Sequence, residues 1–348
     1  MFIRNFAASP KLLVMQGFIK RVLATVLIII CGAGILTCLY ISKVDKSIVK
    51  EEVRIGIAWR ADTTSNSYKN TVRAIKEAGG TPVLLAQVFP NGYAMNGTSL
   101  APEYVDEQGV LLQRYADEVK ILDASRSNVA QAVEEVKAIV FTGGEDVSPT
   151  LFRKPEPWHG IEEDKNFNAS RDISDYITMA YCLEKDIPVL GICRGMQVLG
   201  IVSGASFIQD IGTYLKSQGI SYENMHRSVS QPAESRDYIP HDVRVTTHES
   251  LLYKITDTDI IANVPSWHHQ CIGDVAGTPL KVTGVTDTQG VNIIEAIERP
   301  DRQFCLGVQF HPEAAVVRHL DGKSSATQFM SYEAALCYFT GLIKSIGQ

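Results

Sequence analysis

The amino-acid sequence predicts an α/β fold: a single domain with a mostly parallel central sheet flanked by helices. From residue 53 onward, short apolar segments alternate with segments that have helical apolar spacing, as in sheets whose parallel strands are joined by helices. Residues 187–192 (IPVLGI) are almost wholly apolar, which suits a strand buried on both faces. Apolar residues make up 45% of the 348 residues, enough to fill one large core.

The elements of this domain can be assigned in order along the chain. Alternating side chains predict a first strand at 53–59, and apolar spacing predicts a helix at 68–78 that two glycines end. Further strands are predicted at 82–85, 138–141, 187–192, 243–246, 291–297 and 304–310, and further helices at 129–136, 170–180, after 193 and at 328–346. Residues 90–127 fit the alternation least well, so we interpret them as an insertion with some helix around 104–120.

The N-terminal region is predicted to hold a membrane anchor. Residues 22–41 carry no charge, and 20 apolar residues suffice to cross a hydrocarbon core of about 30 Å as a helix. A cleaved signal peptide is the alternative, but its apolar core would span only about 7–15 residues before a small-residue cleavage site. We therefore divide the chain into a tail at 1–21, a single-pass transmembrane anchor at 22–41, a linker at 42–52 and the α/β domain at 53–347. Basic residues flank both ends of the anchor, so the membrane side of the domain stays open.

Charge and cysteine content exclude several classes of protein. The formal net charge is −6 and no run of Lys or Arg occurs, so nucleic acid is not an expected partner. The seven cysteines form no CxxC pair, which argues against a zinc ribbon or a thioredoxin-like motif. The sequence predicts no metal and no cofactor, and it leaves a homodimer open.

The first candidate catalytic residue is Cys193, in the motif Gly191-Ile-Cys193-Arg-Gly195. This motif joins the apolar strand to the following helix, and a nucleophile on such a turn is exposed at the carboxyl edge of the sheet. The helix N-terminus favours negative charge there, and so favours the reactive thiolate. The alternative is a buried cysteine beside two packing glycines. The strand before the motif and the helix after it favour the nucleophile.

A second motif, Gly307-Val-Gln-Phe-His311-Pro-Glu313, supplies a base and a carboxylate. In an extended segment, residues two apart point to the same side, so His311 and Glu313 are expected to point to one side. An imidazole oriented by a carboxylate is what attack by a cysteine needs. Without Cys193 elsewhere in the chain, a surface turn would be the better interpretation.

Glycines also end the predicted strand at 138–141, in the sequence Phe141-Thr-Gly-Gly144. Glycine lets backbone N–H groups approach a ligand closely. An N–H of this segment, together with the amide of Arg194, could form an oxyanion hole. Alone, this segment would be read as an ordinary strand-ending turn.

Together these motifs resemble the class I glutamine amidotransferase superfamily, and within it the γ-glutamyl hydrolase branch, which includes γ-glutamyl-γ-aminobutyrate hydrolases. The motifs occur in the family's order: TGGED at 142–146, RD at 171–172, GICRGMQVLG at 191–200, HHQ at 268–270 and GVQFHPE at 307–313. The resemblance covers about 54–346. It implies the flavodoxin-like fold of that superfamily, with Cys193 as nucleophile, His311 as general base and acid, and Glu313 as the residue that orients the imidazole.

The resemblance also implies further site residues. It places the backbone of Gly144 and Arg194 in the oxyanion hole and Gln197 beside the glutamyl group. His269 is placed near the substrate, although a solvated loop pair is the alternative for His268 and His269. Three features depart from the family: the anchor, the length of 90–127, and Ala-Ala-Val rather than an aromatic residue after Glu313.

Three functions are weighed from these features. The first is hydrolysis of the γ-glutamyl amide bond of a small γ-glutamyl compound through a γ-glutamyl thioester, which releases glutamate and an amine. Arg-Gly-Met-Gln after the nucleophile favours this hydrolase over a synthetase glutaminase. The alternative is a glutaminase that delivers ammonia to a partner synthetase. The third is a non-catalytic, membrane-anchored binding protein. It ranks last because the chain holds all three residue types of a catalytic triad, which argues against a non-catalytic role.

Overall fold

Five parallel strands form one half of a nine-stranded sheet, and four antiparallel strands continue it. The computed structural model describes residues 52–228, 238–323 and 329–347. The predicted tail and anchor and nearly all of the predicted linker lie outside these residues. In the described ranges, no helix is long and apolar enough to cross a membrane, so the anchor at 22–41 stays a prediction.

The sheet runs in the order β2-β1-β5-β6-β13-β12-β11-β8-β9. Its strands are β1 (Arg54–Ile57), β2 (Thr81–Leu84), β5 (Ala138–Phe141), β6 (Val189–Ile192), β13 (Cys305–Val308), β12 (Val291–Glu298), β11 (Lys281–Thr288), β8 (Ile239–Val245) and β9 (Ile260–Ser266). Two short pairs lie apart from it, β3 (Met95–Asn96) with β4 (Ser99–Leu100), and β7 (Ser206–Ile208) with β10 (Cys271–Asp274).

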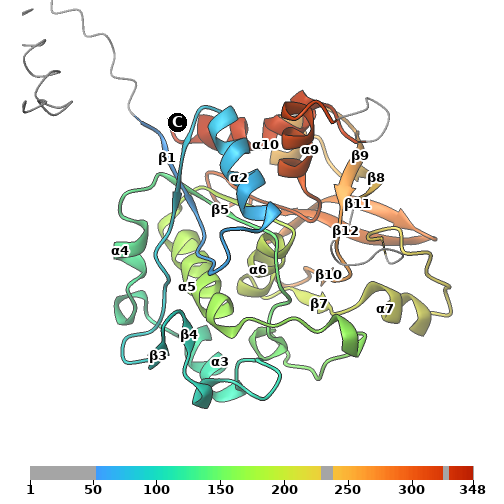
Figure 1. Ribbon diagram of the computed structural model, residues 1–348. Helices are drawn as coiled ribbons and strands as arrows, with labels where there is room; N and C mark the ends of the chain where they lie inside the picture. The colour runs from blue at the N-terminus through green and yellow to red at the C-terminus, as the bar shows by residue number, and fades with distance from the viewer. Residues whose placement is uncertain (1–51, 229–237, 324–328, 348) are drawn as a thin grey trace, which may run out of the picture. The chain divides into compact units, whose positions relative to one another are not determined.

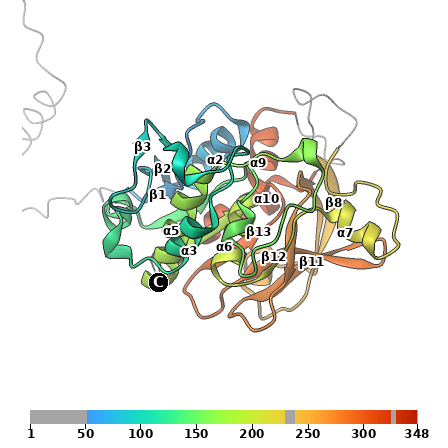
Figure 2. The same cartoon turned by 90° about the horizontal axis from the view of Figure 1, so that it is seen from below.

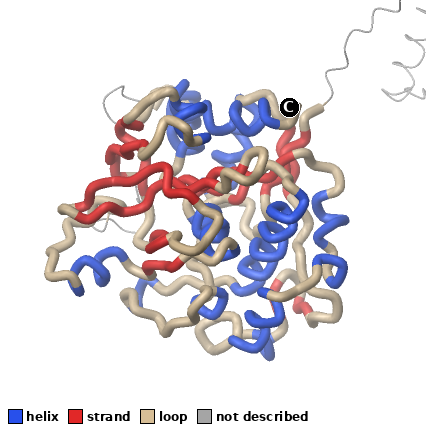
Figure 3. The backbone as a smooth tube through the Cα atoms, turned by 180° about the vertical axis from the view of Figure 1, so that it is seen from behind, coloured by secondary structure: helices blue, strands red, loops and turns tan. Residues whose placement is uncertain are grey.

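Helices cover both faces of the sheet (Figure 1, Figure 3). The helices of one layer are α2 (Asn66–Glu77), α8 (Leu251–Thr256), α9 (Pro312–Leu320) and α10 (Tyr332–Ser345). The other layer holds α3 (Gln113–Lys120), α4 (Val129–Val133), α5 (Ala169–Lys185) and α6 (Arg194–Val202). The short helix α7 (Ile211–Ser217) lies near the antiparallel strands, at the opposite end of the domain from β1 to β3 (Figure 2).

Two apolar cores fill the spaces between these layers. One lies under α3 to α6 and includes Phe141, Met196 and Leu199. The other lies under α2, α9 and α10 and includes Tyr338 and Leu342. All four residues of β6 are buried, as are all four of β5 and β13. The wholly apolar strands of the sequence are therefore the central strands of the sheet.

The predicted α/β fold with a mostly parallel sheet is confirmed for β2, β1, β5, β6 and β13, the strands that hold the candidate site. The antiparallel half was only partly foreseen, since β9, β11 and the β7–β10 pair were not predicted. The segment 90–127 holds α3 within its predicted helical region, and Leu111 and Ala116 pack into the core under α5. It is thus an integral part of one helix layer.

Candidate active site

Cys193 stands between β6 and α6 in a strained backbone conformation, with φ 52° and ψ −106°. A non-glycine residue with positive φ is uncommon and often marks a functional site. The flanking glycines make the turn sterically feasible. A Cβ on Gly191 would lie 2.7 Å from the backbone of Gly195, and one on Gly195 would overlap the carbonyl of Phe141. The turn therefore has the strand–cysteine–helix form that the sequence predicted.

His311 and Glu313 form a buried pair, with the imidazole Nδ1 2.7 Å from Glu313 Oε1. The prediction of an extended segment was wrong. His311 caps α9, Pro312 occupies the first helical turn and Glu313 follows it, because proline is well suited to the first helical position. The first turn of the helix, and not strand alternation, brings the two side chains together.

The surroundings of His311 favour its protonated form. Burial lowers the pKa of His311, but the Glu313 carboxylate, with further contributions from Tyr238 and Cys193, raises this pKa well above its ordinary value. The Tyr238 ring lies 5.0 Å from the imidazole, centre to centre, and burial raises the pKa of Tyr238 to about 12. With Nδ1 on Glu313, Nε2 is the ring atom left for proton exchange with a thiol.

Cys193 and His311 border one small space beside Gly143. A Cβ on Gly143 would lie 2.8 Å from His311 Cε1 and 3.5 Å from Cys193 Cβ. The Cys193 Sγ is turned toward the carbonyl of Trp267, 3.9 Å away, and His311 Nε2 has no well-aligned hydrogen bond among the described residues. Catalytic hydrogen bonds often tighten only when substrate binds, and rotation of the cysteine side chain changes its direction.

The two predicted oxyanion-hole residues are the sequence neighbours of Gly143 and Cys193, which border this space. Gly144 and Cys193 line the same cavity, and Arg194 begins α6, where helical N–H groups have no partner within the helix. A Cβ on Gly144 would overlap the guanidinium of Arg171, so a larger residue would have to displace this side chain from its ion pair with Glu145. The roles of both amides as oxyanion donors stay predictions.

A buried ionic network lies beneath the turn. Arg194 pairs with Asp172 at 2.6 Å and with Asp175, and all three side chains are at most 1% exposed. Arg171 pairs with Glu145 and also donates to the carbonyls of Thr142 and Gly143. The Arg-Asp pair at the start of α5 therefore holds both the glycine turn and the start of α6.

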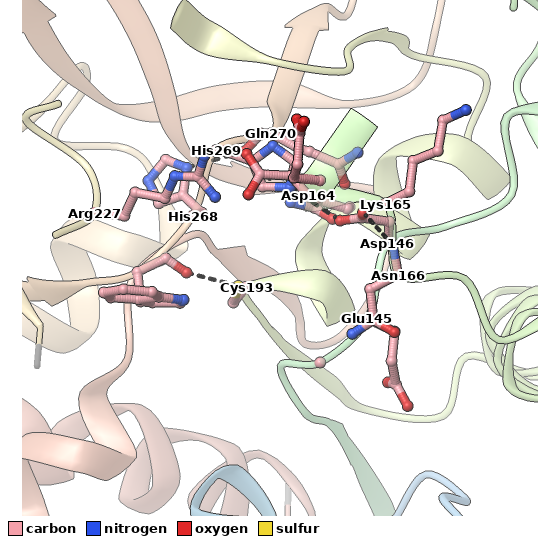
Figure 4. A pocket seen from close by; sticks show the side chains of 14 residues that line it. Glu145, Asp146, Asp164, Lys165, Asn166, Cys193, Arg227, His268, His269 and Gln270 are labelled. Carbon is pink, nitrogen blue, oxygen red and sulfur yellow. Dashed lines mark hydrogen bonds and ion pairs between the residues drawn. The ribbon is translucent and has the colours of Figure 1, made fainter. Parts of the chain in front are cut away.

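A cavity of about 310 Å³ opens above Cys193. Figure 4 shows Arg227 and His268 on one side of Cys193 and Asp146 and Lys165 on the other. The lining is polar, with carboxylates outnumbering cations: Glu145, Asp146, Glu163 and Asp164 against Lys165 and Arg227. Asp164 and Arg227 pair with each other. Such a cavity suits a small zwitterionic or amine-bearing molecule better than an apolar one.

Both predicted substrate-binding side chains line this cavity. Gln197 is buried and its amide lies 3.4 Å from both the Gln270 carbonyl and Gln309 Oε1. His269 lies between Asp146 at 3.1 Å and Asp210 at 3.3 Å. Burial lowers the pKa of His269, but these two carboxylates outweigh it and raise the pKa to about 8. The alternative of a solvated loop pair does not hold for the buried His268.

Sequence reasoning missed the acidic residues of the cavity. Asp146 belongs to the TGGED motif, but Asp164, in a single 3-10 turn, and Asp210, which caps α7, carry no recognisable signal. Acidic residues outside helices and strands are usually solvated, and only the fold shows that Asp146 and Asp164 line one cavity while Asp146 and Asp210 flank His269.

Comparison with known proteins places this constellation in a family. The profile of the Peptidase C26 family matches residues 118–313, a range that begins in α3 and ends on Glu313. The chain belongs to the Peptidase C26 family. The predicted resemblance to the glutamine amidotransferase superfamily is confirmed, and the Peptidase C26 match supports a hydrolytic enzyme at that coarse level.

The chain is also similar to individual proteins of known sequence or structure. Protein NtpR of Enterococcus hirae is 30% identical over 194 residues, which cover 56% of this chain and 74% of that protein. A provisionally named glutamine amidotransferase of Mycobacterium tuberculosis is 32% identical over 189 residues, 54% of each chain. The solved glutaminase domain of Trypanosoma brucei CTPS, with bound acivicin, overlaps 85% of this chain and 94% of its own, at 15% identity and a TM-score of 0.48.

Proposed function

We propose that this protein hydrolyses the γ-glutamyl amide bond of a small γ-glutamyl compound and releases glutamate and an amine. One observation carries the proposal. A strained cysteine at a strand-to-helix turn shares a small space with a buried, carboxylate-oriented imidazole, and this cysteine lines a polar cavity that would take a small charged substrate.

The reaction follows from this arrangement in two stages. The Cys193 thiol gives its proton to His311 Nε2, and Sγ bonds to the γ-carbonyl carbon. The carbonyl oxygen becomes an oxyanion, which the amides of Gly144 and Arg194 would stabilise. The carbon–nitrogen bond then breaks as His311 protonates the amine. Water adds to the γ-glutamyl thioester with His311 as base, and glutamate leaves as the thiol re-forms.

The charges of the cavity suggest how the glutamyl group is held. A γ-glutamyl group carries an α-ammonium and an α-carboxylate, so it needs partners of both signs. Asp146 and Glu163 could accept from the ammonium, and Lys165 or Arg227 could pair with the carboxylate. Gln197 would contact the glutamyl chain from the floor of the cavity.

A panel of γ-glutamyl amides tests the proposal. The full-length protein is incubated with γ-glutamyl derivatives of γ-aminobutyrate and of polyamines, with polyglutamate, with glutathione and with free glutamine, and released glutamate is measured. We expect turnover of at least one amine-substituted compound without any added protein. If the protein acts only on glutamine, and only when a synthetase is added, the glutaminase alternative is favoured. The name of the M. tuberculosis relative supports this alternative. No turnover, together with a Cys193 that resists iodoacetamide, would favour the binding protein.

Substituting Glu313→Gln should change both the rate and its pH dependence. The Glu313 charge raises the pKa of His311 against the effect of burial, so its loss lowers that pKa. His311 must be protonated to release the amine, and the alkaline limb of kcat/KM should therefore move to lower pH. We also expect kcat/KM to fall by about 10²- to 10⁴-fold. The measurement is a pH–rate profile on the best substrate of the panel.

The exposed Glu249→Gln removes one carboxylate outside the site and serves as the control, with an unchanged profile. An alkaline limb that stays in place in Glu313→Gln would show that the carboxylate does not act through His311.

A further inference from the structure

Three histidines and one glutamate meet in the interior, and among them His268 also lines the cavity above Cys193. They are His226, which follows α7, His241 on β8, His268 after β9 and Glu295 on β12. All four are buried, and one side-chain donor atom from each lies within 4.8 Å of the other three. The proposed hydrolysis uses none of these side chains.

The imidazole nitrogens converge on one carboxylate but do not hydrogen-bond to it. Glu295 Oε1 lies 3.2 Å from His226 Nδ1, 3.3 Å from His268 Nε2 and 3.8 Å from His241 Nε2. None of these contacts has hydrogen-bond alignment, and these three nitrogens and both Glu295 oxygens lack a hydrogen-bond partner within the described part of the chain. Leaving so many buried polar atoms unpaired is costly.

The outer nitrogen of each imidazole is fixed by a neighbour. His268 Nδ1 lies 2.9 Å from the Gln270 carbonyl, which can only accept, so Nδ1 carries the proton. His241 Nδ1 lies 3.1 Å from Thr286 Oγ1. Because that hydroxyl donates to the carbonyl of Asp242, it accepts from the imidazole. His226 Nε2 lies 2.8 Å from Thr288 Oγ1.

These bonds have an electrostatic consequence. With Nδ1 protonated, the neutral forms of His241 and His268 turn the lone pair of Nε2 toward the buried Glu295 carboxylate. Lone pairs that face an anion in a buried region of low dielectric repel it unless a proton or a metal cation lies between them. Outer nitrogens held by hydroxyl or carbonyl groups, with inner nitrogens converging, are the arrangement found around metal-bound histidines.

We propose that His226, His241, His268 and Glu295 bind a divalent transition-metal ion, with Zn²⁺ as the expected occupant. A tetrahedral Zn²⁺ with ligand bonds of about 2.0–2.1 Å holds its ligand atoms about 3.3 Å apart, close to the three distances measured to Glu295 Oε1. Three imidazoles and one carboxylate are borderline donors that suit Zn²⁺ better than Ca²⁺ or Mg²⁺. The sequence predicted no metal because these ligands are too far apart in the chain to form a motif.

The site is structural. Its four protein ligands fill a tetrahedral shell, whereas a catalytic zinc keeps one position for water. The metal would join the segment that holds His226 to β8, β12 and the 266–270 loop. One backbone hydrogen bond already joins this segment to the loop, from His268 N to the His226 carbonyl at 3.0 Å. That loop carries Trp267, whose carbonyl contacts the Cys193 thiol, and His269. The inference does not depend on the proposed reaction.

Metal content tests the site directly. The full-length protein is purified without chelators or metal-affinity steps, and its metals are measured by inductively coupled plasma mass spectrometry. We expect about one divalent transition metal per chain, as a four-ligand site predicts. A metal content below about one-tenth of that amount, both as purified and after refolding with Zn²⁺, would overturn the proposal. The four residues would then be a histidine cluster that shares protons with Glu295.

Variants show whether the metal lies where we place it. His241→Gln and Glu295→Gln should each lower the metal content at least about tenfold. The control is His248→Gln, the same substitution at an exposed histidine that follows β8 and pairs with Asp259, and it should keep the metal. An equal metal content in all three variants would show that the ion binds at another site.

A measurement on the unaltered protein covers the case in which these variants fail to fold. Replacement of the metal by Co²⁺ during refolding should give the intense visible absorption of a four-coordinate ion, and X-ray absorption should show nitrogen or oxygen ligands at about 2.0–2.1 Å. A weak, six-coordinate Co²⁺ spectrum would contradict the buried tetrahedral site.

Discussion

Replacing Cys193 with serine is expected to lower kcat by about 10⁴-fold or more while the protein stays folded. The hydroxyl is a far weaker nucleophile than a thiolate at neutral pH, and nucleophile substitutions in triad enzymes have effects of this size. Serine should fit the turn, because the close packing of Gly195 on Phe141 shapes the turn. This packing does not involve the sulfur of Cys193. Glutamate release by single-turnover kinetics and circular dichroism of the same sample provide the measurement.

Cys337→Ser is the matched control. Cys337 lies on α10, outside the cavity, and burial raises its pKa to about 12, so it should remain a thiol and its loss should leave kcat unchanged. Burial likewise raises the pKa values of Cys182, Cys271 and Cys305. Iodoacetamide at neutral pH should therefore label Cys193 ahead of these four. Wild-type kcat in Cys193→Ser would end the assignment of this residue as the nucleophile.

The features that could be predicted from sequence are those with a local cause. The turn at Cys193 follows from glycines two residues before and two residues after it, next to an apolar strand, and all of this evidence lies within a dozen residues. The pairing of His311 with Glu313 was predicted correctly, but for the wrong backbone. Pro312 is compatible with a strand end and with a first helical turn, and the short sequence does not distinguish them.

The features that could not be predicted depend on distant segments. His226 and Glu295 are separated by most of the antiparallel half of the sheet, and neither stands in a metal-binding spacing. The strands β9 and β11 that bring them together carry mixed burial and proline or glycine in their interiors, which weakens the alternation of a strand. The acidic cavity was missed for the same reason, because charged loop residues gain a meaning only from their neighbours in the fold.

Replacing Arg194 with methionine should destabilise the domain by about 3–5 kcal/mol. Methionine matches the length of the side chain but leaves Asp172 and Asp175 without their main cation in a region that is at most 1% exposed. Burial lowers the pKa of Arg194, but the two carboxylates outweigh it and raise that pKa above its ordinary value, so the charged pair is the favoured state. Urea unfolding followed by tryptophan fluorescence measures the free energy of unfolding.

The pH dependence of this loss identifies its cause. Burial raises the pKa of Asp172, and without Arg194 this carboxyl is expected to take up a proton in the folded state more readily than in the unfolded chain. Stability of the variant should then fall as the pH rises, and the destabilisation should be larger at pH 8 than at pH 5. Asp172→Asn keeps an acceptor for the Ser148 amide and hydroxyl. The double variant with Arg194→Met and Asp172→Asn should therefore lose less stability than the sum of the two single losses.

Arg73→Met, which breaks an exposed ion pair with Asp321, should cost less than about 1 kcal/mol. A loss of that small size in Arg194→Met would mean that solvent or rearranged partners satisfy the two carboxylates, and that the turn at Cys193 does not depend on the network beneath it.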